Sequence, residues 1–334
     1  MFNPDNRSLS RMNPRRRIPL ALALLGALAP AYAQSPQKYP AKPIRLVLPF
    51  PPGGSTDIIA RVVGQKLTEA WGQQVIIDNR PGAGGNVAAE FVARAAPDGY
   101  TLFQANVANA IGAGLYPKLN YSLTNDFAAV SQLATTPYVL LSHPSVPAKN
   151  VRELIALAKA RTGQLNYASA GAGSATHLSG ELLKSMAGID IVHVPYKGTG
   201  PAVTALLSGE VDLYFATVPA AAPMVKAARL RALGVSSARR AALMPDVPAI
   251  AETLKGYDTG TWHGVLAPVA TPKEIVQQLS TEIIRILNAP DVREKLVAQG
   301  LDPVGDTPEQ FAAFLRAEIA KWAKVVKASG ARPD

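Results

Sequence analysis

The sequence predicts an α/β fold of two lobes, in each of which a sheet is flanked by helices. Apolar runs of strand length alternate along the chain with segments of helical periodicity, an order typical of α/β proteins. The alternation changes near Phe127–Ser142 and then resumes. The chain has 334 residues, more than the roughly 100–200 residues of a usual domain, which favours two domains over one.

The first half of the chain begins with five elements in strand–helix alternation, which predicts a parallel sheet with helices on its faces. They are the strand Ile44–Leu48, the helix Ile58–Trp71, the strand Val75–Asp78, the helix Asn86–Ala96 and the strand Thr101–Gln104. A second α/β unit follows the change near Phe127–Ser142. Its expected elements are the helix Val151–Ala160 with Asn150 as N-cap, the strand Asn166–Ala168, the helix Ala175–Met186, the strand Ile191–His193, the helix Pro201–Ser208 and the strands Leu213–Ala216 and Arg231–Val235.

The last part of the chain returns to one strand, Thr261–Ala267, and then to long helices with clear start signals. Thr271 and Thr307 each precede a proline and have Glu or Gln three positions on. This pattern predicts two capping boxes with proline at the first helical position. The final helix is amphipathic, which predicts that it packs back on the first lobe. Its apolar positions are Phe311, Phe314, Leu315 and Ile319.

Residues 1–33 have the pattern of a secretory signal. Five arginines precede the apolar stretch Ile18–Leu28, and Ala31-Tyr32-Ala33 has the form of a cleavage site. The stretch contains a proline and is shorter than the roughly 20 residues of a membrane span, which argues against an anchor. We therefore expect export, through the general or the twin-arginine route, and cleavage near Ala33.

Charge and cysteine content narrow the classes of function. Removal of residues 1–33, which hold five Arg and one Asp, lowers the formal net charge from +10 to +6. Lys and Arg are spread along the chain and aromatic residues are few, which argues against a nucleic-acid groove. The chain has no cysteine, so it forms no disulfide and offers no lipid acceptor at the cleavage junction. We expect a soluble protein of the bacterial periplasm.

Two glycine-rich loops are the strongest indication of function. Pro49–Asp57 and Ser169–His177 each follow a strand-like run and each open a helix. Backbone N–H groups at such a turn point outward at the positive end of the helix dipole, where an anion is favoured. Two such loops predict one anion held from two sides. The candidate contacts are Gly53, Gly54, Ser55 and Thr56 in the first loop and Ala172, Gly173, Ser174 and His177 in the second.

Each loop also has a plainer interpretation. A tight strand-to-helix turn with Ser55 or Thr56 as N-cap accounts for the first loop equally well. Asp57 falls in the first helical turn, where its charge complements the dipole but would repel an anion, so we expect it to brace the loop. Neither loop has the glycines and lysine of a P-loop or the spacing of a dinucleotide fingerprint.

A serine hydrolase is the alternative from another class of function. It would use Ser55 or Ser174 with His177 or His193, but the last glycine of a nucleophile elbow is missing from both loops. The four histidines lie far apart in the sequence and no H-E-x-x-H motif occurs, so we expect no metal site, no cofactor and no catalytic residue.

Three further positions lie where open α/β sheets bind ligands. Asn106 and Thr217 follow strands at their carboxyl ends, and Trp262 opens the last strand. We expect all three to contact the ligand. A third loop, His193–Pro201, offers Thr199 as a cap candidate and Lys197 as a counter-charge, although most such lysines are solvated.

Several motifs in one order resemble the receptors of tripartite tricarboxylate transporters, also called the Bug family, along essentially the whole mature chain. The motifs are Tyr39–Leu48, the loop Pro49–Asp57, Asn79–Asn86, Ala96–Leu102, Val194–Gly198, Trp262-His263-Gly264, Ala267-Pro268 and Thr271-Pro272. The resemblance implies a two-lobed periplasmic-binding-protein fold of type II-like form, with a mixed sheet in each lobe. It further implies a monomer that captures a small carboxylate in the cleft and delivers it to membrane permease subunits.

The resemblance also implies domain boundaries and roles for the loops. Lobe one would comprise residues 34–135 and 260–334, and lobe two residues 136–259. Both glycine loops correspond to the family's carboxylate-gripping pair. The chain departs from the family at Ala216-Thr217, where an acidic or amide residue is frequent, which leads us to expect a ligand without an amino group. Phe215, Val218 and Trp262 would then offer it apolar contact. The alternative is that these residues belong to the core and that an acidic group from elsewhere, such as Asp258, reaches the cleft. A sensor that feeds a signalling partner is a third interpretation.

Overall fold

The computed structural model describes residues 39–332, so the predicted signal segment, residues 1–33, lies outside the described residues. Within the described part, no helix has both the length and the apolar character that crossing a membrane requires.

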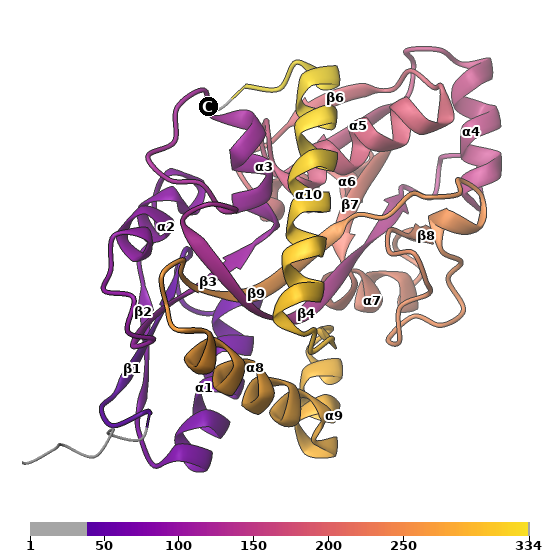
Figure 1. The fold of residues 1–334 in the computed structure, drawn as a ribbon. Helices are drawn as coiled ribbons and strands as arrows, with labels where there is room; N and C mark the ends of the chain where they lie inside the picture. Colours follow the sequence, from indigo (N-terminus) through magenta and orange to yellow (C-terminus); the bar gives the residue numbers. More distant parts are fainter. Residues whose placement is uncertain (1–38, 333–334) are drawn as a thin grey trace, which may run out of the picture. The chain divides into compact units, whose positions relative to one another are not determined.

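One long mixed sheet organises the described chain, with strands in the order β2-β1-β3-β9-β4-β7-β5-β6. β8 and β10 also pair with β4 (Figure 1). The strands are β1 (Ile44–Leu48), β2 (Val75–Asn79), β3 (Thr101–Asn106), β4 (Phe127–Ser142), β5 (Asn166–Ser169), β6 (Val192–Pro195), β7 (Leu213–Thr217), β8 (Arg231–Val235), β9 (Gly260–Pro268) and β10 (Asp302–Pro303).

β4 explains the change in the sequence pattern near Phe127–Ser142. It is one strand of 16 residues. Its residues up to Pro137 pair with β9, and those from Tyr138 onward pair with β7 and β8. The same strand therefore belongs to both halves of the sheet, and its partners change in the middle.

The predicted parallel sheet is only partly correct. β1 is parallel to β2 and β3, and β5 is parallel to β6 and β7. β9 and β4 run antiparallel to their neighbours. β9 returns to the first sheet half beside β3, and the antiparallel strands β9 and β4 make each half mixed.

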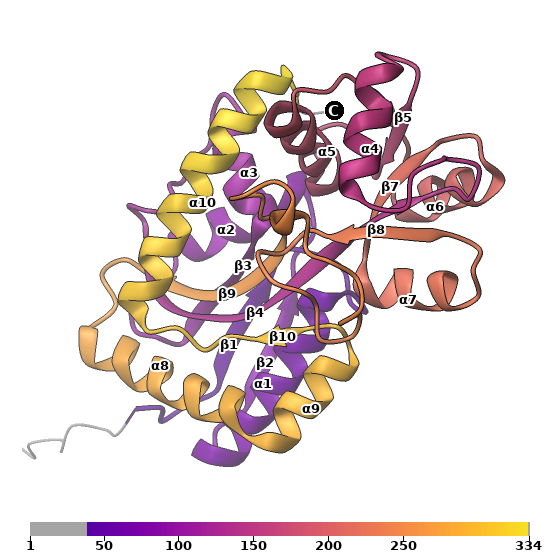
Figure 2. The same cartoon turned by 90° about the vertical axis from the view of Figure 1, so that its right-hand side faces the viewer.

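Ten α-helices are found among the described residues, and they flank the sheet (Figures 1 and 2). They are α1 (Ser55–Trp71), α2 (Asn86–Ala93), α3 (Val107–Leu115), α4 (Val151–Ala160), α5 (Ala175–Ala187), α6 (Thr199–Ser208), α7 (Val218–Lys226), α8 (Lys273–Asn288), α9 (Pro290–Ala298) and α10 (Pro308–Ser329). The sequence analysis did not predict α3 or α7. α3 is apolar almost all round and α7 contains two prolines, so neither has the usual amphipathic pattern.

The predicted helix caps were right in some cases and wrong in others. Thr307 forms the expected capping box at α10, and Asn150 caps α4. Ser55 and Thr56 lie inside α1, whose N-cap is Gly54. Thr199 and Thr271 are not caps either, because α6 is preceded by Gly198 and α8 by Pro272.

The buried apolar side chains form four clusters. Two consist of residues from the beginning and the end of the described chain, together with Leu178 of α5, and the other two consist of residues 138–257. α10 supplies Phe311 and Leu315 to one of the first two, so the prediction that the last helix packs on the first part of the chain is confirmed. Figure 2 shows α10 passing α3 and reaching α5.

Candidate ligand site

The first glycine loop ends in an open turn at the start of α1. Gly53 and Gly54 are exposed, and Gly53 has φ +94°, which favours glycine. Asp57 Oδ2 accepts a hydrogen bond from the Gly53 N–H at 3.2 Å. The same carboxylate accepts from Arg61 at 2.8 and 3.0 Å. The hydrogen bonds from Arg61 and Gly53 keep the Asp57 pKa below its usual range. Asp57 is therefore charged and stabilises the turn through its bond to the Gly53 N–H.

The first turn of α1 presents backbone donors with no cap. Gly54 provides no side-chain hydrogen bond to the helix. Among the described residues, the N–H groups of Ser55, Thr56 and Asp57 have no hydrogen-bond partner. Uncapped N–H groups at a helix start form an anion site. Thr56 is 5% exposed and its Oγ1 lies 3.5 Å from Nδ1 of His263. Its side chain therefore points into the protein, and the group that it can offer a ligand is its backbone N–H.

The second glycine loop is held by hydrogen bonds of its own side chains. Ser174 Oγ donates to the Gly171 carbonyl at 2.7 Å and accepts from the His177 N–H at 3.2 Å, which caps α5. Thr176 Oγ1 accepts from the Ala170 N–H at 3.0 Å. Ser169 Oγ accepts from the Gly171 N–H at 3.1 Å. The N–H groups of Ala172, Ala175 and Thr176 have no partner among the described residues.

Two histidines lie behind this loop. Nδ1 of His177 accepts the Gly173 N–H at 3.0 Å, and Nε2 of His193 lies 2.6 Å from Ser169 Oγ. The two imidazole rings stack with centroids 3.8 Å apart and an interplanar angle of 12°. Burial lowers the pKa of both rings, to about 4 for His193.

α3 lies between the two loops. At its start, Asn106 accepts from the Ala108 N–H and Asn109 accepts from the Asn106 N–H, at 2.9 and 3.0 Å. A side chain at Gly85 would meet Asn109 and also Pro49, which begins the first loop. At the other end, a side chain at Gly173 would meet Leu115 at 2.8 Å.

The structure does not place Trp262 with the loops. Its indole is 2% exposed, packs on Phe311 and Phe314 of α10, and donates to Glu318 at 2.9 Å. The next residue, His263, faces α1 instead, as the alternation of side chains along a strand requires. Trp262 therefore serves the packing of α10 in this arrangement, and its contact with a ligand stays a prediction.

The residues expected to give apolar contact near Thr217 are also buried. Phe215 and Val218 are each 1% exposed and belong to core clusters. Thr217 itself is half-buried at the end of β7, beside Tyr138 of β4. Its side chain does not cap α7, which leaves the hydroxyl available.

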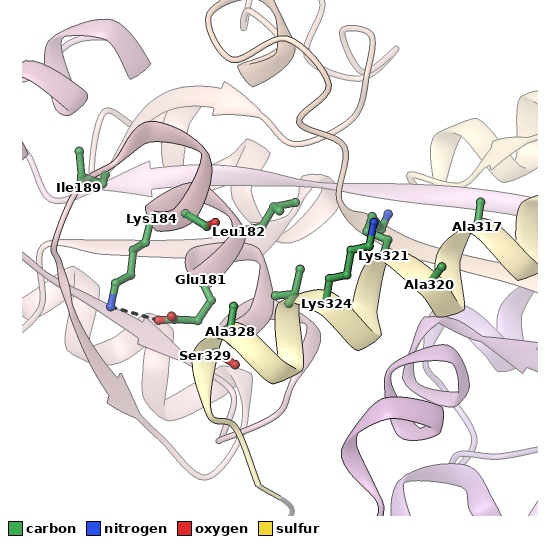
Figure 3. A pocket seen from close by; sticks show the side chains of 12 residues that line it. Glu181, Leu182, Lys184, Ile189, Ala317, Ala320, Lys321, Lys324, Ala328 and Ser329 are labelled. Atoms are coloured by element: carbon green, nitrogen blue, oxygen red, sulfur yellow. Dashed lines mark ion pairs between the residues drawn. The ribbon is translucent and has the colours of Figure 1, made fainter.

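A cavity of about 790 Å³ lies between α5 and α10. None of the residues predicted for the ligand site lines it. Lys184, Lys321 and Lys324 contribute to its wall, and Lys184 pairs with Glu181 at 3.3 Å (Figure 3). Glu181 also accepts from Tyr167 at 2.7 Å and lies 4.0 Å from Nε2 of His177. This wall therefore adjoins the second loop's histidines.

Sequence reasoning missed three side chains beneath the loops. His193 was considered only as a catalytic base, Asn109 was not considered, and Gln104, which donates to the Thr56 carbonyl at 2.9 Å, was taken as an ordinary strand residue. Asn109 could have been found, because an Asn three residues after an Asn cap has the spacing of a capping box. The contacts of His193 and Gln104 have no local signature.

Comparisons with known proteins agree with the architecture. Residues 59–331 match the model of the tripartite tricarboxylate transporter family receptor. Protein BugT of Bordetella pertussis is 38% identical over 94% of this chain and 97% of its own. The R. palustris protein Rpa4515, solved with adipate, has a TM-score of 0.74 and 38% identity, covering 89% of this chain and 100% of that one. MatC from Rhodopseudomonas palustris, with bound malate, has a TM-score of 0.70 and 35% identity, covering 86% of this chain and 100% of that one.

Proposed function

This chain belongs to the tripartite tricarboxylate transporter receptor family, and from that premise we propose that it is an exported, monomeric receptor for a small dicarboxylate. In this proposal the receptor works in the periplasm, holds the anion between two lobes and delivers it to membrane permease subunits. It releases the anion chemically unchanged and uses no cofactor.

The observation that carries the proposal is the pair of helix starts behind the two glycine loops. α1 offers the N–H groups of Ser55, Thr56 and Asp57, and α5 offers those of Ala172, Ala175 and Thr176. Burying a carboxylate costs several kcal/mol unless donors replace its water. Each hydrogen bond to a charged group contributes about 1.5–3 kcal/mol, so four or five donors suffice for micromolar affinity, near −8 kcal/mol.

The proposed lobes are residues 34–135 with 260–334, and residues 136–259. In the described part, the core clusters and the change of partners along β4 support this division. Since one loop belongs to each lobe, an open cleft cannot complete the donor set, and closure about the connecting strands follows binding.

We expect saturation with adipate to reduce the radius of gyration, because both lobes must approach the ligand. Small-angle scattering with and without adipate measures this change. Gly173→Val provides the matched protein in which the same adipate concentration should leave the radius unaltered. An unchanged radius in the wild-type protein, with binding established by calorimetry, would place the site within a single lobe.

We expect amine-free dicarboxylates to bind better than aspartate or glutamate. Ala216 is buried and Thr217 is uncharged, so neither position supplies a carboxylate partner for an ammonium group, whose burial without one is costly. Two neighbours of known structure hold adipate and malate. A thermal-shift panel of adipate, malate, succinate, citrate, benzoate, aspartate and glutamate tests the preference, and stronger stabilisation by either amino acid would contradict it.

Mass spectrometry of the same acids and of their esters distinguishes a receptor from an exported hydrolase. Two serine–histidine side-chain pairs are in hydrogen-bond contact among the described residues. Ser169, which pairs with His193, is 0% exposed, so a substrate cannot reach it, and Ser145, which pairs with His143, lies outside both glycine loops. Ser174 is committed to capping α5. Mass spectrometry should recover each bound acid, and simple esters of those acids, unaltered after incubation. Turnover of an ester that is lost in Ser174→Ala would favour the hydrolase instead.

A further inference from the structure

The second loop is built on a pair of imidazoles that no ligand needs to touch. His177 follows the loop on α5, and His193 comes from the neighbouring strand β6. Their rings lie 3.8 Å apart and nearly parallel. Each ring holds a different part of the loop: His177 holds the Gly173 N–H at 3.0 Å, and His193 holds Ser169 Oγ at 2.6 Å.

The Gly173 contact fixes the charge state of His177. Nδ1 accepts a hydrogen bond there, so it carries no proton, and a neutral His177 has its proton on Nε2. Protonation of Nδ1 would set two N–H groups against each other. Gly173 has φ +72°, and the hydrogen bond from its N–H to His177 fixes the orientation of the turn. The neighbouring N–H groups of Ala172 and Ala175 have no partner within the described chain.

The charged and titratable groups around the rings come from three elements. α5 contributes Glu181, 4.0 Å from Nε2 of His177, and Lys184, which pairs with Glu181 at 3.3 Å. β5 contributes Tyr167, whose hydroxyl donates to Glu181 at 2.7 Å and whose ring lies beside both imidazoles. β6 contributes His193. Glu181 would favour a charged His177, but its oxygen is already shared by Tyr167 and Lys184.

We propose that His177 and His193 are positioning residues for the anion: as a stacked, neutral pair they hold the second loop in its binding shape and leave the contacts to backbone amides. This inference rests on the proposed function and reassigns His177 from ligand contact to support. Burial lowers the pKa of both rings. Glu181 acts in the opposite direction on His177, whereas His177 and Lys184 lower the pKa of His193 further. Both rings therefore stay neutral to a lower pH than an ordinary histidine.

The proposal predicts that the affinity for the anion depends little on pH. With both rings neutral, the affinity for adipate should change by less than about twofold between pH 8 and pH 6, where carboxyl groups remain ionised. If binding required a histidinium of ordinary pKa in contact with the carboxylate, the affinity would instead rise about 25-fold over that range, because the protonated fraction rises from about 3% to about 76%. Calorimetry at both pH values distinguishes the two. ¹⁵N shifts of the imidazoles should give His177 as the Nε2–H tautomer throughout.

Variants separate a positioning role from general packing. His177→Leu leaves the Gly173 N–H without an acceptor and should weaken adipate binding at least about tenfold. His177→Asn retains an acceptor near the place of Nδ1 and should stay within about threefold of wild type. His193→Leu should weaken binding and speed hydrogen exchange at Gly173. His143→Leu, which removes a half-buried histidine bonded to Ser145, is the matched control.

The outcomes distinguish this inference from the proposed function. Wild-type protein that binds no acid of the panel overturns the function, and the positioning role with it. Wild-type binding that persists at full affinity in folded His177→Leu overturns the inference alone. An affinity that rises toward about 25-fold from pH 8 to pH 6 in wild type, but not in His177→Asn, would make His177 a charged ligand contact.

Discussion

Replacing Gly173 with valine should reduce the affinity for adipate at least about a hundredfold. Gly173 has φ +72°, a conformation that β-branched residues adopt only with strain. Its first side-chain atom would also lie 2.8 Å from Leu115 of α3. The turn must therefore change shape, which breaks the bond to His177 and turns the loop's amides away from the ligand.

Gly188→Val is the matched control for backbone strain. Gly188 lies at the other end of the same helix with φ +59°, and a side chain there meets nothing within 4 Å. Both variants carry a similar strain, of order 1–3 kcal/mol, but only one alters the loop. Circular dichroism establishes that both are folded and calorimetry gives the affinities. Equal affinities in the two variants would remove the second loop from the binding site.

Gly54→Ala probes the first loop without strain. Gly54 has φ −84° and open space around it, so alanine fits the free protein. A loss of affinity in this variant must arise where the ligand approaches. This distinction could not be made from the sequence, in which Gly53, Gly54 and Gly173 look alike.

The local features of the fold were predictable because their signals lie within a few residues. β1, α4 and β8 have the expected bounds, and the caps at Asn150 and Thr307 are as predicted. Thr271 has the same sequence signal as Thr307 yet is no cap, since the chain turns through a bond from the Thr271 N–H to the Pro268 carbonyl and the helix begins later. The local turn before the helix therefore distinguishes Thr271 from Thr307, although their sequence signals are equal.

The site was predictable only where it is made of a continuous loop. Glycines before a helix mark both turns that we propose to bind the anion, but the groups that support them come from distant segments. Thr56 meets His263 across 207 residues, and His177 stacks on a histidine of another strand. For Trp262, the alternation along β9 could be read from the sequence, but which face of that strand meets α10 could not.

Replacing Glu318 with leucine should lower the free energy of unfolding by about 2–5 kcal/mol. Oε2 of this buried carboxylate accepts from the indole N–H groups of Trp262 on β9 and Trp322 on α10, each at 2.9 Å, and Lys321 pairs with its other oxygen. Leucine leaves two buried donors unpaired, at about 1–3 kcal/mol each. Glu318→Gln keeps an acceptor and should lose only about 1 kcal/mol.

Urea unfolding, followed by tryptophan emission, measures both variants. If α10 is fastened to β9 through this carboxylate, the leucine variant should unfold at lower urea with an unchanged slope. Lys321→Met isolates the surface side of the ion pair and should cost less than about 1 kcal/mol. Leucine and glutamine variants of equal stability would mean that apolar packing, supplied by Phe311 and Leu315, holds the helix without the shared carboxylate.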